Sequence, residues 1–398
     1  MKARDVVITG VGTIAATGAG YAEFTRALDA GEFPLTRLDD ARLVAGAPSH
    51  AALVPKDATN AWIRPLVARR MSAPSRFGVA AMRAAAVDAG LATPDEPWHA
   101  DERTAVCFGN AWGSTLYTEK LLQQLEERGP EGISPYLFME TVANAPAGQV
   151  ALDQRARGPN LTLTQREASD VAALARGAAL IESGRAERVL AGTVAEMSSI
   201  LHVILGRFGA LTRESRARPF DLRRDGFIAA EGATVFVLES ADVARARGAV
   251  VRARIAGWAR ANDPSASATD WGVGADGLAA ALSGRIDLAS IERVVSGAAG
   301  ARRGDALEAQ VLLKAFRGAV PPVIAPKAIV GEYGSGFLAS ALHFATSDVV
   351  PKPLATAVPD PALGLVAMGG VTLAPARRTL VTSLASGGPA AWVALARP

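Results

Sequence analysis

Residues 158–174 read GPNLTLTQREASDVAAL. The alternation of apolar and polar residues in Leu161–Thr164 predicts a short strand, and the alanine-rich run that begins at Val171 predicts a helix. A short polar turn joins the two, with Glu167 at its centre. Turns that lead from a strand into a helix often carry a catalytic nucleophile. Any function proposed for the chain must therefore explain why a carboxylate stands at this turn.

Composition argues against several classes of function. The chain has 398 residues, of which 49% are hydrophobic, enough for a large core. The net charge is only +3, and the basic residues are scattered as pairs such as Arg69-Arg70 and Arg302-Arg303. Nucleic-acid binding is therefore not expected, because it usually requires a clustered basic stripe. The single cysteine, Cys107, excludes an intrachain disulfide and suits a reducing compartment.

The sequence also carries no signal for export or for a cofactor. It starts with MKARDVVITGVG and enters a strand by Val6, so a signal peptide is not expected. No run of about 18 apolar residues predicts a membrane span, and we expect a cytoplasmic protein. The four histidines, His50, His99, His202 and His343, are too few to predict a metal site built from imidazoles. We expect neither a metal nor a cofactor.

Apolar strand-like runs alternate with alanine-rich helical runs along the chain, which predicts an α/β fold. The predicted strands are Val6–Gly10, Thr104–Gly109, Leu161–Thr164, Arg188–Gly192, Ala233–Glu239, Val250–Gly257, Arg293–Gly297, Pro322–Pro326, Gly364–Met368, Arg378–Ser383 and Ala391–Ala396. The predicted helices include Ser75–Ala89, Ser169–Ser183, Leu307–Phe316 and Ser335–Thr346.

Two successive sets of strand–helix units predict an internal duplication. We expect an N-terminal half of residues 1–245 and a C-terminal half of residues 246–398, joined near Glu239–Gly248. No low-complexity linker separates the halves, so they should pack as one body. Gly31–Thr59 and Thr93–Arg103 have weak periodicity and several turn residues, which predicts excursions at the surface.

Five segments carry a resemblance to a known family. They are VVITGVGTIAATGAGYAEFTRALDAGE (6–32), RRMSAPSRFGVAAMRAAAVDAGL (69–91), ANAPAGQVALDQRARGPNLTL (143–163), ARPFDLRRDGFIAAEGATVFVLESADVARARGA (217–249) and GDALEAQ (304–310). Together they resemble the β-ketoacyl synthase branch of the thiolase fold, and the fourth is the most specific match. The resemblance implies a thiolase-like, duplicated fold of α-β-α-β-α layers.

The family's catalytic motifs are only partly kept. Its Thr-Ala-Cys-Ser-Ser-Gly motif aligns with residues 165–170 and places Glu167 at the cysteine. The first histidine motif places Gly297 at its histidine, and the second keeps Lys327 but has Glu332 at its histidine. In the C-terminal glycine-rich loop, Ser386 stands at the gating phenylalanine. By this resemblance the chain lacks all three groups that form, decarboxylate and condense thioesters.

The substitutions suggest a plugged site. If the fold is kept, Glu167 and Glu332 should lie close together and repel. We predict that Lys327 forms an ion pair with one of them, and Arg166 is a second candidate for compensation. A pocket filled by these polar groups is favoured over a new catalytic role. Gly387, followed by Gly388, could offer a backbone N–H to an oxyanion, but more simply forms a tight turn.

The resemblance therefore implies a subunit that does not condense, similar to the chain-length factors of type II polyketide and aryl-polyene synthases. Such a subunit has no activity alone, forms a heterodimer with an active ketosynthase and works with an acyl carrier protein. The implied dimer face includes Thr141–Gln149 and Leu161–Thr164. Phe138 and Met139 are implied to reach the partner's tunnel, with Ser386 and Gly387 at the gate. For the apolar segment, ordinary core is the simpler interpretation.

Two alternatives stay open at this point. In the first, the chain is a repurposed enzyme in which Glu167 or Glu332 acts as a general acid or base on a carrier-bound acyl chain. In the second, the chain is a docking scaffold for the carrier protein. A chain-length factor should tolerate Glu167→Gln, whereas an acid–base enzyme should lose orders of magnitude in rate. A scaffold should be insensitive to bulky residues in the tunnel.

Overall fold

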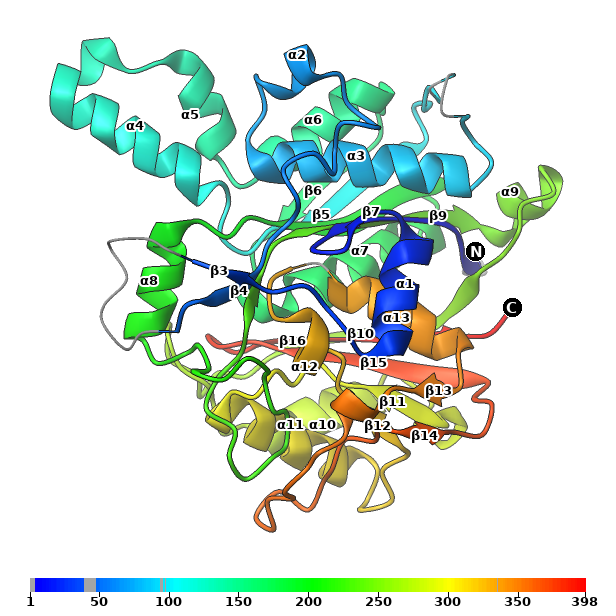
Figure 1. The fold of residues 1–398 in the computed structure, drawn as a ribbon. Helices are drawn as coiled ribbons and strands as arrows, with labels where there is room; N and C mark the ends of the chain where they lie inside the picture. The colour runs from blue at the N-terminus through cyan, green and yellow to red at the C-terminus, as the bar shows by residue number, and fades with distance from the viewer. Residues whose placement is uncertain (1–3, 39–47, 94–95, 97, 335) are drawn as a thin grey trace.

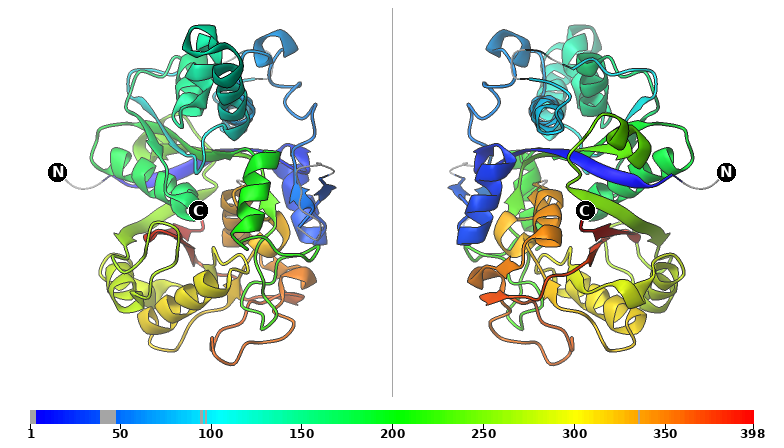
Figure 2. Two further views of the ribbon diagram at one scale, coloured as in Figure 1. Left: turned by 90° about the vertical axis from the view of Figure 1, so that its left-hand side faces the viewer. Right: turned by 90° about the vertical axis from the view of Figure 1, so that its right-hand side faces the viewer.

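The fold is built from five layers that alternate between helices and sheet (Figure 1). The structure is a computed structural model that describes residues 4–38, 48–93, 96, 98–334 and 336–398. The main sheet has eleven strands, ten of which run in the order β12-β11-β15-β16-β10-β1-β9-β7-β5-β6, and β2 pairs with β1 off this path. The side views of Figure 2 show helices on the outer faces and between the two halves of this sheet.

The sheet repeats one topology twice. The first set is β1 (Val6–Ala15), β5 (Thr104–Gly109), β6 (Asn160–Leu163), β7 (Arg188–Ala195) and β9 (Gly232–Ser240). The second set is β10 (Ala253–Asn262), β11 (Arg293–Val295), β12 (Val323–Ile324), β15 (Arg378–Leu384) and β16 (Pro389–Ala396). In the first set β5 is parallel to β6 and β7, and in the second β11 is parallel to β12 and β15. The remaining pairs within each set are antiparallel, so the predicted duplication is present in the topology.

Helices fill the layers around the strands. The main helices are α1 (Tyr21–Ala30), α3 (Ala73–Asp88), α4 (Thr115–Arg128), α5 (Pro135–Thr141), α6 (Ala145–Gln154), α7 (Ser169–Glu182), α8 (Ser199–Arg207), α10 (Ala275–Ser283), α11 (Arg302–Ala315) and α13 (Gly336–Thr346). In Figure 1, α3 and α6 cover the outer face of the first set, α7 and α13 lie between the sets, and α10 and α11 cover the second. The α4–α5 pair projects from the body.

Short elements complete the chain. They are β2 (Gly18–Ala19), β3 (Thr36–Arg37), β4 (His50–Ala52), α2 (Pro65–Ala68), η1 (Pro130–Gly132), η2 (Arg166–Ala168), β8 (Ala229–Ala230), α9 (Ala241–Ala246), η3 (Leu288–Ser290), α12 (Lys327–Val330), β13 (Val349–Val350), η4 (Lys352–Leu354) and β14 (Val371–Thr372).

Close packing of α3 on β1 depends on small residues. All ten residues of β1 are buried. A side chain at Gly10 or Gly12 would place its Cβ 2.3 or 1.9 Å from the carbonyl oxygens of Ala85 or Ala81 in α3. Ser72 caps the N-terminus of this helix by accepting a hydrogen bond from the backbone of the third residue along. The strand and helix can therefore lie against each other without a gap.

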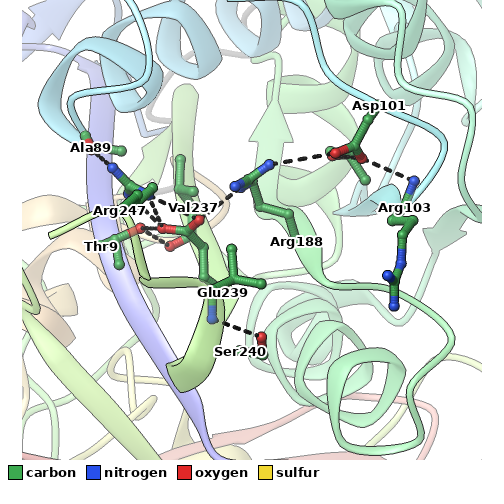
Figure 3. A network of polar contacts seen from close by, with 11 residues as sticks. Thr9, Ala89, Asp101, Arg103, Arg188, Val237, Glu239, Ser240 and Arg247 are labelled. Atoms are coloured by element: carbon green, nitrogen blue, oxygen red, sulfur yellow. Dashed lines mark hydrogen bonds and ion pairs between the residues drawn. The ribbon is translucent and has the colours of Figure 1, made fainter. Parts of the chain in front are cut away.

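The buried carboxylate of Glu239 forms hydrogen bonds that connect the ends of several elements in the first set (Figure 3). Glu239 has a fully buried side chain and accepts hydrogen bonds from Thr9 Oγ1 at 2.7 Å and Arg188 Nε at 2.7 Å. Arg247 also bonds both carboxylate oxygens, and its Nη1 donates to the Ala89 carbonyl at 2.7 Å. Despite burial, these donors lower the pKa of Glu239. The network ties β1, β7 and the end of α3 to the segment where we predicted the halves to join.

The sequence predictions of the fold hold with two corrections. Gly364–Met368 is not a strand, because it makes isolated backbone hydrogen bonds, such as Met368 N–H to the Val323 carbonyl at 2.7 Å, and no continuous ladder. Gly31–Thr59 is not merely a surface excursion, because β3 and β4 join β8 in a three-stranded sheet that buries Ala51 and Ala52. Residues 39–47, 94–95 and 97 of the two predicted excursions lie outside the described residues, as does Ser335 at the start of the predicted helix Ser335–Thr346. The division at residues 245 and 246 stays a prediction.

Candidate functional site: a carboxylate at the strand-to-helix turn

The site lies where loops after parallel strands of both sets converge. Glu167 follows β6 and precedes α7, which packs on strands of both sets. Gly297 follows β11, Lys327 begins α12 just after β12, and Ser386 lies in the turn between β15 and β16. The carboxyl ends of parallel strands are a common location for binding sites in α/β folds. Here the topology brings together positions more than 200 residues apart in the chain, such as Glu167 and Ser386, which are hydrogen-bonded across 219 positions.

The Glu167 carboxylate is almost fully occupied by hydrogen bonds. Tyr333 Oη donates to Oε1 at 2.6 Å, the Ser386 backbone N–H donates to Oε2 at 3.1 Å, and Ser386 Oγ lies 3.2 Å from Oε2. The Ser383 hydroxyl also holds the Glu167 carbonyl at 2.7 Å. Glu167 itself is 9% exposed. The carboxylate is therefore anchored by donors from two loops that are distant in sequence.

Lys327 and Glu332 form the ion pair that we predicted. Lys327 Nζ lies 2.7 Å from Oε1 and 2.9 Å from Oε2 of Glu332, and both residues are buried. The ammonium also lies 4.7 Å from the centre of the Phe337 ring, on the first turn of α13. The retained lysine therefore neutralises the glutamate at the histidine position and does not pair directly with Glu167.

The Lys327 ammonium interacts electrostatically with several carboxyl groups. Burial raises the pKa of Glu332 to about 7, opposed by Lys327 and assisted by the nearby charge of Glu167. Burial also raises the pKa of Asp170, again opposed by Lys327. Burial acts to lower the pKa of Lys327, but Glu332 and Asp170 outweigh it and the pKa is raised. Lys327 is thus charged at neutral pH, and Glu332 exchanges its proton near pH 7.

Tyr333 links the two glutamates, and the sequence did not single it out. It directly follows Glu332 and adopts the left-handed conformation with φ 66°, which turns its hydroxyl toward Glu167. Its ring makes edge-to-face contacts with Trp112 at 5.5 Å and Phe227 at 5.7 Å. Burial, together with the neighbouring carboxylates, raises its pKa well above the ordinary value, so the phenol stays a donor. No local sequence pattern signals this unusual backbone conformation.

Arg166 is the second residue whose role the sequence only partly indicated. Its backbone has φ 48°, and its guanidinium lies 5.9 Å from the Trp112 ring centre. Nη1 donates to Ser386 Oγ at 3.0 Å. The arginine therefore faces the same serine that donates to Glu167, and compensates that carboxylate through Ser386 without a direct ion pair between the described atoms.

Gly297 offers no space for a histidine. A Cβ added at this position would lie 2.6 Å from the Thr382 carbonyl oxygen and 3.0 Å from Ser383 Cα. Its backbone N–H donates to Thr382 Oγ1 at 3.4 Å. The backbone at this position is thus packed directly against β15.

The glycine-rich turn has no free donor for an oxyanion. The Gly387 N–H donates to the Asp270 carbonyl at 2.9 Å and the Gly388 N–H to the Ala385 carbonyl at 3.2 Å. Both glycines have positive φ, 87° and 99°, as the tight turn requires. The remaining N–H, that of Ser386, is held by Glu167. The turn therefore serves to bind the carboxylate of the chain itself.

A cavity of about 450 Å³ opens beside Glu167. Its walls are mainly apolar and aromatic, including Trp112, Phe227, Trp271 and Tyr333, with Arg166 and Ser386 near the carboxylate. This size is within the range of small-molecule sites. Phe138 and Met139 do not line this cavity: they lie on α5 and are 60% and 57% exposed.

The remaining candidates from the sequence are the cysteine, a metal site and a membrane-spanning helix. Cys107 is buried in β5, where burial raises its pKa to about 12 and makes it a poor nucleophile. Among the described residues, no group of three His, Cys, Asp or Glu side chains is arranged to hold a metal ion. In the same part of the chain, no helix has the length and apolar character needed to cross a bilayer.

Comparison with known proteins identifies the family. The model of the beta-ketoacyl synthase N-terminal domain matches residues 3–244, which is more than half of the chain. The chain therefore belongs to the β-ketoacyl synthase family. Together with the layered sheet, this confirms the predicted thiolase-like fold.

The chain aligns with only part of the length of its curated relatives. The chain is 29% identical over 271 residues to 3-oxoacyl-[acyl-carrier-protein] synthase 2 of Vibrio cholerae serotype O1, covering 66% of this chain and 64% of the relative. It is 33% identical over 273 residues to putative polyketide beta-ketoacyl synthase 2 of Streptomyces cyaneus, covering 65% and 64%. The alignments thus span less than two thirds of these relatives.

Solved structures match the whole chain. The ishigamide ketosynthase/chain length factor superposes with a TM-score of 0.88 and 26% identity, covering 100% of both chains. A beta-ketoacyl synthase from Burkholderia phymatum STM815 also gives a TM-score of 0.88, with 25% identity and 100% coverage of both chains.

Proposed function

We propose that this chain is the non-condensing, chain-length-factor subunit of a two-subunit ketosynthase. It pairs with a cysteine-containing β-ketoacyl synthase, shapes the tunnel that receives the acyl chain, and acts on chains carried by an acyl carrier protein. Polyketide or aryl-polyene synthesis in the cytoplasm is the proposed setting. The subunit alone forms no carbon–carbon bond and uses neither a metal nor a cofactor.

The occupied Glu167 carboxylate carries this proposal. A condensing enzyme needs a thiolate here and free donors for the charge that develops on the thioester oxygen. The Ser386 N–H is instead bound to Glu167, and Gly297 lies too close to β15 for a histidine. Restoring the condensation reaction would require new groups at several positions at once. The proposed loss of condensation therefore does not depend on a substitution at one residue.

Two comparisons support a polyketide setting and a partner of the same fold. The full-length match to the ishigamide ketosynthase/chain length factor relates the chain to a protein whose name joins the two subunit types. The relative from Streptomyces cyaneus is named putative polyketide beta-ketoacyl synthase 2. We infer from these names that the chain works as part of such a pair.

Two features of the surface support a protein–protein interface on one face of the molecule. β6 is the edge strand of the main sheet, so one side of its backbone has no strand partner among the described residues. The helix α6 contacts both β6 and α5, and α5 exposes Tyr136, Phe138 and Met139 by 67%, 60% and 57%. Exposed apolar side chains beside a free sheet edge favour burial by a second protein. We propose that the partner ketosynthase covers this face in an obligate interface of more than about 2,000 Å².

One observation favours a second candidate function. Glu167 borders the cavity of about 450 Å³, so a bound acyl chain could approach its carboxylate. In this second function Glu167 acts as a general acid or base. The hydrogen bonds from Tyr333 and Ser386 favour the non-catalytic role, because they hold the carboxylate in place and occupy the atoms that would exchange a proton.

Coexpression with a cysteine-containing ketosynthase from the same gene neighbourhood tests the proposal. We expect a heterodimer in native mass spectrometry when both chains are present, and self-association or poor solubility when this chain is expressed alone. Bulky residues at Phe138 and Met139 (both to Trp) should change product length, whereas a carrier-docking scaffold would leave it unchanged. A stable monomer that forms no complex would contradict the proposal.

A further inference from the structure

The helices α4 and α5 belong to an arm, residues 114–141, that leaves and rejoins the body at one place. Figure 1 shows the two helices projecting from the layered body. Gly113 lies where the arm begins, and a Cβ added there would lie 3.3 Å from the carbonyl oxygen of Thr141, where the arm ends. Asn110 accepts a hydrogen bond from the Gly113 N–H at 3.0 Å and donates one to the Ala143 carbonyl at 2.9 Å. The base of the arm is therefore narrow.

The arm has almost no hydrophobic contact with the core. Within residues 114–141 the buried side chains are Ser114 and Glu140, and both are polar. In the part of the chain that the structure describes, no residue of α4 is buried and no residue of the arm joins a hydrophobic cluster of the core. Segments with few buried apolar contacts open at a lower free energy than the core does. Apolar packing alone therefore does not fix the arm against the body.

A buried carboxylate of the body holds the start of α4. Glu196 directly follows β7 and is 4% exposed. Its oxygens accept hydrogen bonds from Ser114 Oγ at 3.1 Å, from Thr115 Oγ1 at 3.1 Å and from the Leu116 N–H at 2.8 Å. A negative charge beside the first turn of a helix also interacts favourably with the helix dipole. The first turn of the arm is thus attached to the end of β7.

A second buried carboxylate holds the end of α5. Glu140 belongs to the arm and is 3% exposed. Its Oε2 accepts hydrogen bonds from the Ser72 N–H at 3.0 Å and from Ser75 Oγ at 2.6 Å, both at the start of α3. Its Oε1 accepts a hydrogen bond from Gln149 Nε2 of α6 at 2.7 Å. The two ends of the arm are therefore held by one buried carboxylate each.

Two contacts between neutral groups add to this attachment. The Tyr117 hydroxyl donates to the Met71 carbonyl at 3.2 Å, and the hydroxyl oxygens of Thr115 and Ser198 lie 2.7 Å apart. A carboxylate forms stronger hydrogen bonds than a neutral oxygen does. The two carboxylates therefore contribute most to holding the arm in place.

We propose that residues 114–141 form a hinged arm, which opens as one unit about its base while the rest of the chain stays folded. Glu196 and Glu140 are the two clamps that hold it closed. Resting on the proposed function, we further expect the partner ketosynthase to cover Phe138 and Met139, which are exposed on the arm, and so to keep the arm closed.

Hydrogen exchange of the full chain at low denaturant concentrations, followed by mass spectrometry, measures the opening. Amides of α4 and α5 should exchange at least about 100-fold faster than those of β1, with a weaker dependence on denaturant, because opening of the arm exposes little surface. Glu196→Ala and Glu140→Ala should each speed exchange in both helices by about tenfold or more. Glu126→Ala is the matched control, because it removes an exposed glutamate of α4, and it should change nothing.

Equal exchange rates in the arm and in β1, or a variant that speeds only the helix that its clamp holds, would overturn the proposal. If a clamp variant does not fold, the comparison of the arm with β1 in the unaltered chain still decides the question. In the complex, exchange of the arm should slow by at least about tenfold. Unchanged exchange in a complex that native mass spectrometry detects would show that the partner does not hold the arm. Absence of any complex would contradict the proposed function instead, while exchange in the chain alone still tests the hinge.

Discussion

Lys327 Nζ lies 2.7 Å from Glu332 Oε1 in a part of the molecule where both residues are buried. The pair has a lysine that the ketosynthase pattern keeps and a glutamate where that pattern has a histidine. Because Asp170 and Glu167 also act on the same ammonium, the lysine holds together a cluster of carboxyl groups that would otherwise repel. The cluster is therefore stabilised by charge compensation.

Lys327→Met should destabilise the protein by about 3–5 kcal/mol, because removing one partner leaves a buried carboxylate uncompensated. The double variant Lys327→Met/Glu332→Gln should recover a large part of this loss. Denaturant unfolding measures both changes. Lys314→Met is the matched control, because Lys314 pairs with Asp276 at the surface, and it should change stability little. Equal effects of the two single variants would refute a special role for the buried pair.

Stability should fall as the pH rises from about 5 to about 8. The buried carboxyl groups of Glu231, Asp305 and Glu332 have pKa values raised to about 7, in each case chiefly by burial. The folded chain thus binds their protons more tightly than the unfolded chain, and this stabilisation is lost as the pH rises through about 7. Glu239 and Asp221 have lowered pKa values, so their contribution is lost only at more acidic pH.

Thermal melting at a series of pH values measures this slope. Glu332→Gln removes one of the titrating groups and should make the slope shallower. A stability that rises over this range, or a slope that Glu332→Gln leaves unchanged, would show that the buried carboxyl groups are already ionised at low pH.

Glu167→Cys should not create a condensing enzyme. The variant supplies a thiol and releases the Ser386 N–H. Under the proposed function, Gly297 and Glu332 still stand where a condensing enzyme has its charge-stabilising histidines. Loss of one oxyanion donor typically costs about 2.7–4 kcal/mol of transition-state stabilisation, and two groups are absent. Mass spectrometry of carrier-bound products should detect no condensation by the variant alone, with a cysteine-containing ketosynthase as the positive control. Product formed by the variant at a rate near that of the control would contradict the account of a site lost at several positions.

Phe138→Glu should prevent pairing without unfolding the chain. Phe138 is 60% exposed, so its replacement should change the free energy of unfolding by no more than about 0.5 kcal/mol. A charge placed in an apolar interface, by contrast, opposes association. Native mass spectrometry with the partner ketosynthase measures the loss. Val250→Glu is the control, since Val250 is 74% exposed. The helix α9, which ends four residues before it, lies on the opposite side from α5 in Figure 1. Intact pairing in Phe138→Glu would place the interface elsewhere.

The sequence predicted features that depend on local pattern or on a motif of fixed spacing. Period-two alternation located most strands. The resemblance to the family placed Lys327 near both Glu167 and Glu332, which predicted an ion pair with one of the two. Alternation also suggested a strand at Gly364–Met368. The structure does bury Leu365 and Ala367 there, but strand formation also needs a neighbouring backbone in register, which the pattern does not contain.

The contacts of Glu167 were not predictable in the same way. Its donors come from Tyr333 and Ser386, 166 and 219 residues away, and they depend on the conformations of two turns. Tyr333 adopts a positive φ that is uncommon for a bulky side chain. Because such a conformation is imposed by tertiary packing, local sequence gave no signal that the carboxylate would be anchored by this residue.

Reconstitution of the two-subunit reaction distinguishes a non-condensing subunit from an enzyme that acts through Glu167. The partner ketosynthase, this chain and a loaded acyl carrier protein are combined, and the products are measured by mass spectrometry with wild-type chain, with Glu167→Gln and with the chain omitted. We expect full-length product only when both subunits are present, in the same amount with Glu167→Gln as with the wild type. Loss of product by orders of magnitude in Glu167→Gln, or product from this chain without its partner, would contradict it.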